Sequence, residues 1–488
     1  MTFPVEGARM NRLRRTLEEV RRNPQLARKQ LHGPSPMGSL SKYIFESQTV
    51  PVTDEIRELA KRHILDTLAS IVACSRLKPA QLARDFALFN SGQTSTAHLL
   101  GTNLKTSLLD AIFANALTAH AAEINDFCPS AFVQPGPAVV ATVMGIGEVL
   151  ACPGEQLMRA VIVGYEISCR LPKALGIRNL QDFGLSSHGI GPTFGSAAAA
   201  ASLLRIPQDR IGEVFAYCVQ QASGSYQWLR DVDHLEKAFL FGGMPARNGT
   251  YAALLVHHGF TGVRDPFEGS PGWLLSCVFL GPESDLDKEK LVYKLGEQFE
   301  LPQVGYKRYP VGGPLQAGVE GLLTLIKTVD RDDIVKVNIK MPGERLSSFS
   351  DNEMPALNLR YLAAVILEDG ELTFEMAASR ERMKTDSIRQ KMEIVTLTHD
   401  PAQERQPRVE SALVEVTLRS AETKQIFIEH VLGFPDRPMS REDVHCKAMD
   451  LLVPVLGIEQ SESLADMVWG LEKVDDIRRL IPLLVPPK

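Results

Sequence analysis

Apolar positions recur at helical spacing through most of the first half of the chain. Residues 56–68 place apolar side chains three and four positions apart, which predicts an amphipathic helix. Residues 53–55, Thr-Asp-Glu, provide an N-cap and an acidic first turn for it. Residues 108–122 and the alanine-rich residues 196–204 have almost no polar face, which is typical of helices buried among other helices. The pattern predicts a compact helical bundle.

The pattern changes after about residue 275. Residues 334–341 and 412–418 alternate apolar with polar side chains, which predicts half-buried strands. Helical patterns over residues 314–328 and 359–367 lie between these strands. We therefore expect a separate α/β unit built on one sheet.

A helical pattern returns near the end of the chain, with residues 440–443 as a start signal. We expect these last helices to pack on the first domain. The predicted fold is mainly α, with a large all-helical domain built from both chain ends and a smaller α/β lid domain. The predicted parts are an N-terminal extension (1–38), the helical domain (39–274), the lid (275–432) and the returning C-terminal helices (433–488).

Composition narrows the class of protein. The 488 residues are 44% hydrophobic and 23% charged, which is ordinary for globular domains. Lysine and arginine number 53 against 59 acidic residues, so no overall charge favours nucleic acid or an anionic membrane. We find no apolar run of the ~18 residues that a membrane span needs. The Arg-rich residues 9–28 contain glutamates, which are unusual in transit peptides. We predict a cytoplasmic protein, with the mitochondrial matrix as the alternative.

Standard catalytic and metal-binding motifs are absent from the sequence. The seven cysteines are scattered without a CxxC pair, which favours reduced thiols over disulfides or a zinc site. There is no GxSxG, HExxH or Walker A motif. The candidates for chemistry are therefore polar residues within otherwise apolar segments.

The first such segment contains His120, Glu123 and Asp126, which share one face if the helix over residues 108–122 continues. The alternative is a capped helix end with His120 hydrogen-bonded in the core. The second segment, residues 186–193, has glycines and hydroxyls in a loop before the alanine-rich helix. Free backbone N–H groups at a helix N-terminus bind anions, although an ordinary capped loop is the alternative.

The third segment surrounds Lys237, whose neighbours are apolar residues and glycines. A partly buried ammonium group normally has an anionic partner, so this lysine indicates a site. The fourth segment, residues 306–310, is a basic and aromatic cluster where the composition changes. Taken alone, it is more typical of a surface turn than of a site.

Together these segments resemble the MmgE/PrpD family, which includes 2-methylcitrate dehydratase, cis-aconitate decarboxylase and iminodisuccinate epimerase. The resemblance covers about residues 40–480. It rests on the order of Ala119-His120, Asn125-Asp126, Pro135-Gly136, Phe194-Gly195 before an alanine run, Lys237 five residues before Gly242, and Tyr309-Pro310.

The resemblance implies a homodimer without metal or organic cofactor, and an active site between the helical domain and the lid. It implies small polycarboxylate substrates and proton transfer at a carbon next to a carboxylate. Such chemistry requires a positioned base and cations or N–H donors for the developing negative charge.

Carried over to this chain, the resemblance makes Lys237 the active-site lysine and Tyr309 the lid tyrosine. Five positions depart from the family pattern: Glu123 replaces an aspartate, Phe127 a threonine, Gln134 a histidine, Ser186 a second histidine with His188 two places away, and Gln316 a lid histidine. Glutamine does not titrate near neutral pH, so the familiar family substrates do not follow from the resemblance.

We therefore predict two groups of site residues. The catalytic candidates are Lys237, Tyr309, His188, Glu123 and Asp126; the substrate-binding candidates are His120, Asn125, Gln134, Ser186, Phe127 and Gln316. The favoured function is a lyase acting on a small carboxylate. An isomerase or epimerase, and a binding protein without turnover, are the alternatives.

Overall fold

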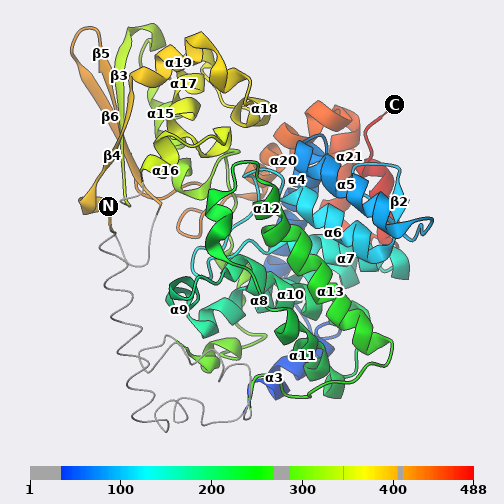
Figure 1. Ribbon diagram of the computed structural model, residues 1–488. Coiled ribbons are helices and arrows are strands. Elements are labelled where there is room, and N and C mark those ends of the chain that lie inside the picture. Colours follow the sequence, from blue (N-terminus) through cyan, green and yellow to red (C-terminus); the bar gives the residue numbers. More distant parts are fainter. Residues whose placement is uncertain (1–34, 269–285, 344–345, 405–409, 488) are drawn as a thin grey trace, which may run out of the picture.

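A computed structural model describes residues 35–268, 286–343, 346–404 and 410–487 of the chain (Figure 1). The predicted boundary at residues 274 and 275, and nearly all of the predicted N-terminal extension, lie outside the described residues. The fold class is confirmed, because the described residues are mainly helical with one small region that contains the main sheet.

Most of the helices form one large unit, which we call the helical unit. From the first half of the chain it contains α3 (Met37–Glu46), α4 (Asp54–Cys74), α5 (Lys78–Ser91), α6 (Leu108–Ala119), α7 (Gly136–Leu150), α8 (Gly154–Leu175), α9 (Ile177–Asp182), α10 (Ser187–Leu203), α11 (Ile211–Gln221), α12 (Leu235–Ala238), the π-helical turn η3 (Phe239–Gly243), and α13 (Met244–His257). Strands β1 (Ala97–His98) and β2 (Lys105–Thr106) form a small antiparallel ladder. Short 3₁₀ turns are η1 (Gln208–Arg210), η2 (Tyr226–Arg230), η5 (Lys288–Leu291) and η6 (Leu301–Gln303).

Helix α10 lies in the middle of the helical unit and packs against α7, α8 and α13. All of its residues are buried, as its alanine-rich sequence predicts. A Cβ atom at Gly195 would lie 2.4 Å from the carbonyl oxygen of Gly164 on α8, so the two helices cross too closely for any side chain there. Small residues thus set the spacing of the helices at the centre of the molecule.

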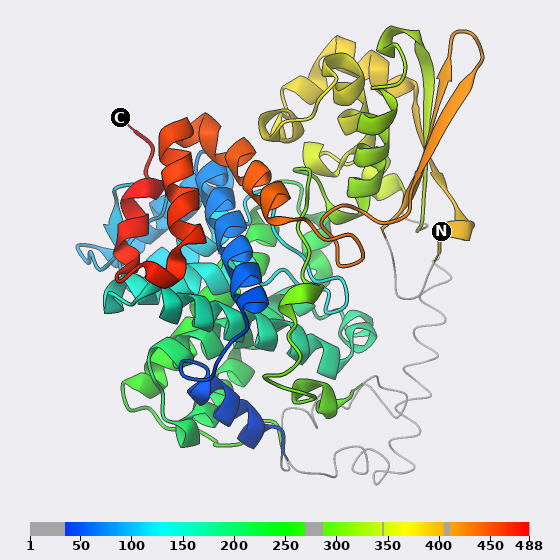
Figure 2. The same ribbon diagram turned by 180° about the vertical axis from the view of Figure 1, so that it is seen from behind.

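The C-terminal segment adds α20 (Arg441–Leu456), α21 (Ile458–Trp469), and the turns η12 (Leu471–Lys473) and η13 (Ile477–Leu484). Figure 2 shows α20 beside α4, and the two helices pack together. The predicted start signal is confirmed, since Ser440 and Asp443 form a reciprocal capping box. Both ends of the described chain therefore contribute to the helical unit.

Residues 311–431 form a second unit around the main sheet, which we call the sheet unit. Its strands are β3 (Ile334–Met341), β4 (Val395–His399), β5 (Ala412–Leu418) and β6 (Thr423–Ile428), and its helices are α15 (Gln316–Leu325), α16 (Ser347–Ser350), α17 (Leu359–Asp369), α18 (Phe374–Ala378) and α19 (Asp386–Glu393). Short 3₁₀ turns are η7 (Gly313–Leu315), η8 (Arg331–Asp333), η9 (Pro355–Leu357), η10 (Arg382–Lys384) and η11 (Pro401–Gln403).

The sheet has the order β4-β3-β5-β6, with β4 parallel to β3 and the other pairs antiparallel. Helices α15 and α17 lie on one face of it (Figure 1). Alternate residues of β5 are buried there, which confirms the period-two pattern of the sequence. The sheet unit has its own hydrophobic core.

Two chain segments join the two units. The outgoing segment, around Tyr306, leads from the helical unit to the sheet unit, and the returning segment, around Gly433, leads back. The amide of Tyr306 donates to the carbonyl of Gly433 over 2.7 Å, so these two segments are paired. The outgoing segment also pairs with the helical unit through the bridge between Gly305 and Phe127. These contacts fix the start of the sheet unit against the loop that follows α6.

The helix over residues 108–122 does not continue to Asp126. Helix α6 ends at Ala119 with His120 as its C-cap, so His120, Glu123 and Asp126 do not lie on one helical face. The alternative of a helix end with His120 hydrogen-bonded in the core is confirmed. Helix α10 begins at Ser187 with Pro192 inside it, so most of the predicted loop over residues 186–193 is helical. The predicted loop over residues 186–193 was wrong, because the buried surroundings of this segment favour the helix and local sequence alone does not show them.

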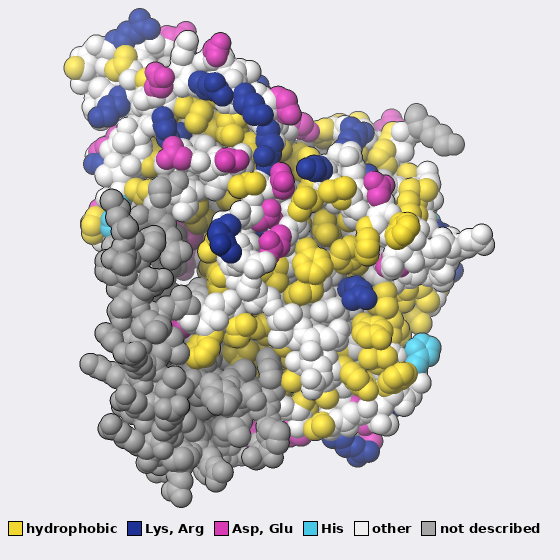
Figure 3. Space-filling model, in the orientation of Figure 1, with side chains coloured by type: hydrophobic (Ala, Val, Ile, Leu, Met, Phe, Trp, Pro, Cys, Tyr) yellow, Lys and Arg dark blue, Asp and Glu magenta, His cyan; other side chains and the backbone are white. Residues whose placement is uncertain are grey.

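Hydrophobic side chains gather on one exposed face of the helical unit (Figure 3). On α5, Leu82, Phe86 and Phe89 are exposed, and the ring of Phe86 contacts Phe113 of α6. Phe113 in turn contacts the exposed Phe239, two residues after Lys237. We call these five residues the aromatic face. In the described part of the chain, no helix combines the length and apolar character of a membrane span.

Candidate active site

Lys237 is positioned by a short helix and a tight π-helical turn. It lies in α12, and Gly242 and Gly243 follow in η3. A Cβ atom at Gly242 would lie 2.1 Å from the carbonyl oxygen of Ala116, so the turn lies directly on α6. This close packing brings Lys237 to the loop that carries Glu123.

Glu123 is the centre of the site. One of its carboxylate oxygens forms an ion pair with the ammonium of Lys237, and the other lies 2.7 Å from the ammonium of Lys307. All three residues are buried, so each charge depends on the others for compensation. Lys237 comes from the helical unit, whereas Lys307 comes from the segment that leads to the sheet unit.

The pKa values of Glu123 and Lys307 are both lowered, for different reasons. Burial alone would raise the pKa of Glu123, but Lys237 and Lys307 hold it well below its usual value. Burial is the main cause that lowers the pKa of Lys307, and the charge of Lys237 adds to it. Glu123 is therefore ionised near neutral pH and holds two cations together.

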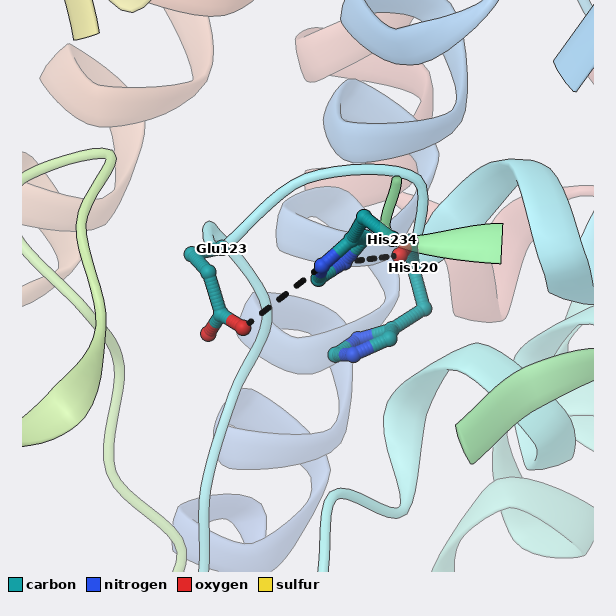
Figure 4. Close-up of side chains that lie close together, drawn as sticks. All are labelled: His120, Glu123 and His234. Carbon is teal, nitrogen blue, oxygen red and sulfur yellow. Dashed lines mark hydrogen bonds and ion pairs between the residues drawn. The ribbon is translucent and has the colours of Figure 1, made fainter. Parts of the chain in front are cut away.

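Three histidines surround this ion pair. The imidazole Nδ1 of His234 lies 4.0 Å from Glu123, and its Nε2 lies 2.9 Å from the carbonyl oxygen of His120 (Figure 4). His234 has a φ of 58°, a left-handed conformation that is strained for most residues but less so for histidine. The rings of His120 and His188 both stack on Phe241, with centroid distances of 4.7 and 3.9 Å.

The histidines are uncharged at neutral pH. Burial is the main cause that lowers the pKa of all three, well below 6.5 for His120 and His188 and to about 4 for His234. Nε2 of His120 and Nδ1 of His188 have no hydrogen-bond partner among the described residues. Neutral imidazoles with an unpaired nitrogen can accept or donate a proton in a reaction.

His120, Glu123 and His234 also place ligand atoms within 4.8 Å of one another, as a metal site would. However, the carboxylate of Glu123 already binds two ammonium groups. A divalent cation there would displace at least one lysine or lie next to two positive charges, which is unfavourable. The residues thus fit an anionic ligand better than a metal ion.

Asp126 lies apart from this cluster. Its carboxylate lies 3.1 Å from Nδ1 of His63 and accepts hydrogen bonds from the hydroxyl of Tyr165 at 2.6 Å and the amide of Gly136 at 3.1 Å. These contacts hold the loop after α6 against α4, α7 and α8. In this arrangement Asp126 contacts neither Lys237 nor Lys307.

Two further contacts hold the same loop. Asn125 lies 2.6 Å from Nδ1 of His120 and donates to the carbonyl of Ala119, so it shapes the turn that ends α6. Lys447 of α20 donates to the carbonyl of Ile124 over 2.7 Å and forms an ion pair with Asp66 of α4 at 2.5 Å. The C-terminal helix α20 thus supports the backbone directly after Glu123.

Gln316 lies in the sheet unit, and Tyr309 lies in the segment that leads to it. Gln316 is buried and hydrogen-bonds the backbone of Tyr309 and Val311, so it holds this turn in place. The ring of Tyr309 is partly buried and packs against the core of the sheet unit. Its nearby charges are Glu320, Arg308 and Arg437, and not those of the Glu123 cluster.

Gln134 and Ser186 are buried, and their side-chain oxygens have no hydrogen-bond partner in this structure. Phe127 contacts Phe132 of the helical unit and Phe434 at the returning segment, so it is an apolar residue between the two units. Thus Lys237, Glu123, His120 and His188 come together, while Asp126, Tyr309 and Gln316 lie outside their cluster.

Sequence reasoning missed three residues of this cluster. Lys307 belongs to the basic and aromatic segment that the sequence had marked, but its burial was not evident. His234 and Phe241 carried no local signal, since an isolated histidine or phenylalanine near a helix is ordinary. Only the folded chain brings them to Glu123.

The chain matches known protein families over nearly all of its length. Residues 38–285 match the MmgE/PrpD N-terminal domain, and residues 309–473 match the MmgE/PrpD C-terminal domain. The chain belongs to the MmgE/PrpD family. The resemblance seen in the sequence is therefore confirmed.

Relatives within the family are distant in sequence but similar in length. The chain is 22% identical to a cis-aconitate decarboxylase-like protein, oryM, of Aspergillus oryzae, over 91% of this chain and 96% of the relative. It is 24% identical to the cis-aconitate decarboxylase of Aspergillus terreus, over 90% and 94%. It is 22% identical to the human cis-aconitate decarboxylase, over 89% and 92%. These relatives are enzymes, which supports an enzymatic role in general.

Proposed function

We propose that this MmgE/PrpD protein is a lyase that removes water or carbon dioxide from a small carboxylate. The observation that carries the proposal is the buried Glu123 with Lys237 and Lys307, beside neutral histidines with unpaired nitrogens. The names of the relatives support the lyase class.

In the proposed reaction, a substrate carboxylate binds to the free N–H donors of Lys237 and Lys307, since an ammonium has three donors and each donates one to Glu123. Negative charge that develops on this carboxylate during proton removal is then stabilised by a preorganised pair of cations. His188 is our first candidate for the base, because its ring is neutral and its Nδ1 is unpaired. No cofactor enters the proposed steps.

An isomerase or epimerase is the second candidate, and Gln134 is the observation that favours it. Loss of a hydroxide requires an acid near the leaving group, and a glutamine at this buried position cannot provide one. Moving a proton between carbon atoms requires only a base and charge stabilisation.

The test is to incubate the purified chain with a panel of small hydroxy- and unsaturated carboxylates in D₂O and follow them by NMR. A lyase produces an alkene or a decarboxylated product. An isomerase incorporates deuterium next to a carboxylate without loss of a group. If no member of the panel shows either change, or if Lys237→Met leaves the rate unchanged, the proposed function is wrong.

A further inference from the structure

The charges around Glu123 bear on how many carboxylates the substrate carries. Lys237 and Lys307 contribute two positive charges, and Glu123 cancels one of them. Lys447 is also buried, but its charge is already balanced by an ion pair with Asp66 at 2.5 Å. The three neutral histidines add no charge near neutral pH. The cluster therefore has about one positive charge to offer an anionic ligand.

Aromatic rings lie next to Lys237 and His188 in this cluster. The ammonium of Lys237 lies 5.1 Å from the ring centre of Trp228 and 5.3 Å from that of Phe241. From His188, ring contacts continue to Phe132 at 5.0 Å and then to Phe127 at 5.7 Å. This row of rings leads from the lysines toward the sheet unit.

Phe127, at the far end of this row, is an apolar residue between the two units. A second or third carboxylate placed along this row would be desolvated without a counter-charge, which is costly. A hydrocarbon group there would gain favourable contact with the rings.

We infer that the site takes a monocarboxylate: one ionised carboxylate at Lys237 and Lys307, and an uncharged, mainly apolar or aromatic remainder along the row of rings. This inference rests on the proposed function for the location of the site. The inferred ligand differs from a tricarboxylate such as cis-aconitate, which appears in the names of the relatives.

The test compares ligands that differ in charge, three of which share a skeleton. Calorimetry measures the Kd of the full chain for 3-phenylpropanoate, for benzylmalonate, which has one more carboxylate, and for cis-aconitate. The uncharged 3-phenylpropanamide is the control for the contribution of the carboxylate. We expect 3-phenylpropanoate to bind about tenfold or more tightly than each of the other three, since one unbalanced or missing charge in a buried site has an effect of this size.

The variant Glu123→Gln provides an independent measurement. It removes the internal anion, so the cluster gains one positive charge, and the preference should move about tenfold or more toward benzylmalonate. Glu123→Asp keeps the charge and should keep the preference for 3-phenylpropanoate. If Glu123→Gln does not fold, the ranking of ligands by the unaltered chain still decides the question.

The inference is overturned if benzylmalonate or cis-aconitate binds as tightly as 3-phenylpropanoate, or if 3-phenylpropanoate does not bind at millimolar concentration. The proposed function can fail separately. Turnover of cis-aconitate with tight binding contradicts the monocarboxylate but supports the lyase. Binding of monocarboxylates without chemical change of any of them supports the substrate class and contradicts the lyase.

Discussion

Lys237 and Lys307 share one carboxylate, so the site can lose one lysine without leaving Glu123 unpaired. Lys237→Met keeps much of the bulk of the side chain and removes its charge. We expect the fold to persist and kcat to fall by about 10² to 10³, the usual effect of removing one electrostatic donor. Steady-state kinetics and a melting curve measure the two effects.

The matched control for Lys237→Met is Lys288→Met. Lys288 is also buried and also pairs with a glutamate, Glu268 at 3.1 Å, and among the described residues we find no contact of this pair with the Glu123 cluster. Its loss should lower Tm and leave kcat unchanged. An unchanged kcat in a folded Lys237→Met protein would place the chemistry elsewhere.

The buried histidines make stability depend on pH. Because burial lowers the pKa of His188 in the fold, the unfolded chain binds more protons below its ordinary pKa of about 6.5. The stability that neutral His188 provides is thus complete above about pH 6.5 and is lost as pH falls. The raised pKa of Glu166, about 7 because of burial, has the opposite effect.

His188→Phe isolates the contribution of one histidine, since Glu166 is the same in both proteins. The phenyl ring retains the stacking on Phe241. The unfolding free energy falls between pH 6.5 and pH 5 with a slope set by the number of protons taken up on unfolding. We expect this number to decrease by up to about one in His188→Phe, so that the slope becomes shallower. Urea unfolding at several pH values measures this slope, and parallel curves for both proteins would contradict the burial of a neutral imidazole.

Activity without a metal ion is a further prediction from the residues of the site. Both carboxylate oxygens of Glu123 pair with lysines, so we expect activity to survive exhaustive chelation. Turnover is measured before and after dialysis against a chelator. Activity that disappears and returns with one divalent ion would assign His120, Glu123 and His234 to a metal instead.

At the level of elements, the crossing of α8 and α10 depends on Gly195. A Cβ atom there would lie 1.9 Å from the hydroxyl oxygen of Ser168 and 2.4 Å from a backbone oxygen, so the helices must separate to admit it. We expect Gly195→Ala to cost about 1–3 kcal/mol of unfolding free energy.

The control for this substitution is Gly38→Ala in α3, where nothing lies within 4 Å of the added atom. It should stabilise the chain by about 0.5–1 kcal/mol, because alanine favours helix over glycine. Denaturant unfolding of both variants measures the difference. Equal effects of the two substitutions would show that the crossing is not tightly packed.

Elements with a strong periodic pattern could be predicted from the sequence. The strands at residues 334–341 and 412–418 match β3 and β5, and the amphipathic pattern of residues 56–68 lies within α4. The sequence left the end of α6 open between two alternatives, because side-chain contacts of Asn125 with the turn compete with another helical turn there. Glu123 and His120 could be chosen as candidates from the sequence around them. Their partners Lys307 and His234 could not, because only the folded chain brings them to Glu123.

At the level of the whole molecule, the homodimer implied by the family resemblance remains a prediction. The aromatic face is the surface on which we expect it, because Phe89 is 86% exposed there and Phe86 52%. Analytical ultracentrifugation should give twice the mass of one chain. Phe89→Glu should shift the mass toward that of one chain, since a charge would then lie in the interface.

Phe427→Glu is the control for the dimer, because Phe427 is also exposed but lies on β6 of the sheet unit. This protein should retain the mass of the unaltered chain. A single-chain mass for the unaltered protein at micromolar concentration would contradict the dimer. If Phe427→Glu dissociates and Phe89→Glu does not, the interface lies on the sheet unit.

The packing of α20 on α4 has a consequence for synthesis on the ribosome. Helix α4 is completed at Cys74, but α20, which covers it, starts at Arg441. At about 5–20 residues per second, the nascent chain waits tens of seconds for this partner. The apolar surface of α4 is open to chaperones and to wrong partners throughout that interval. Slow steps of translation, or a truncated message, would therefore affect this protein first at its N-terminal helices.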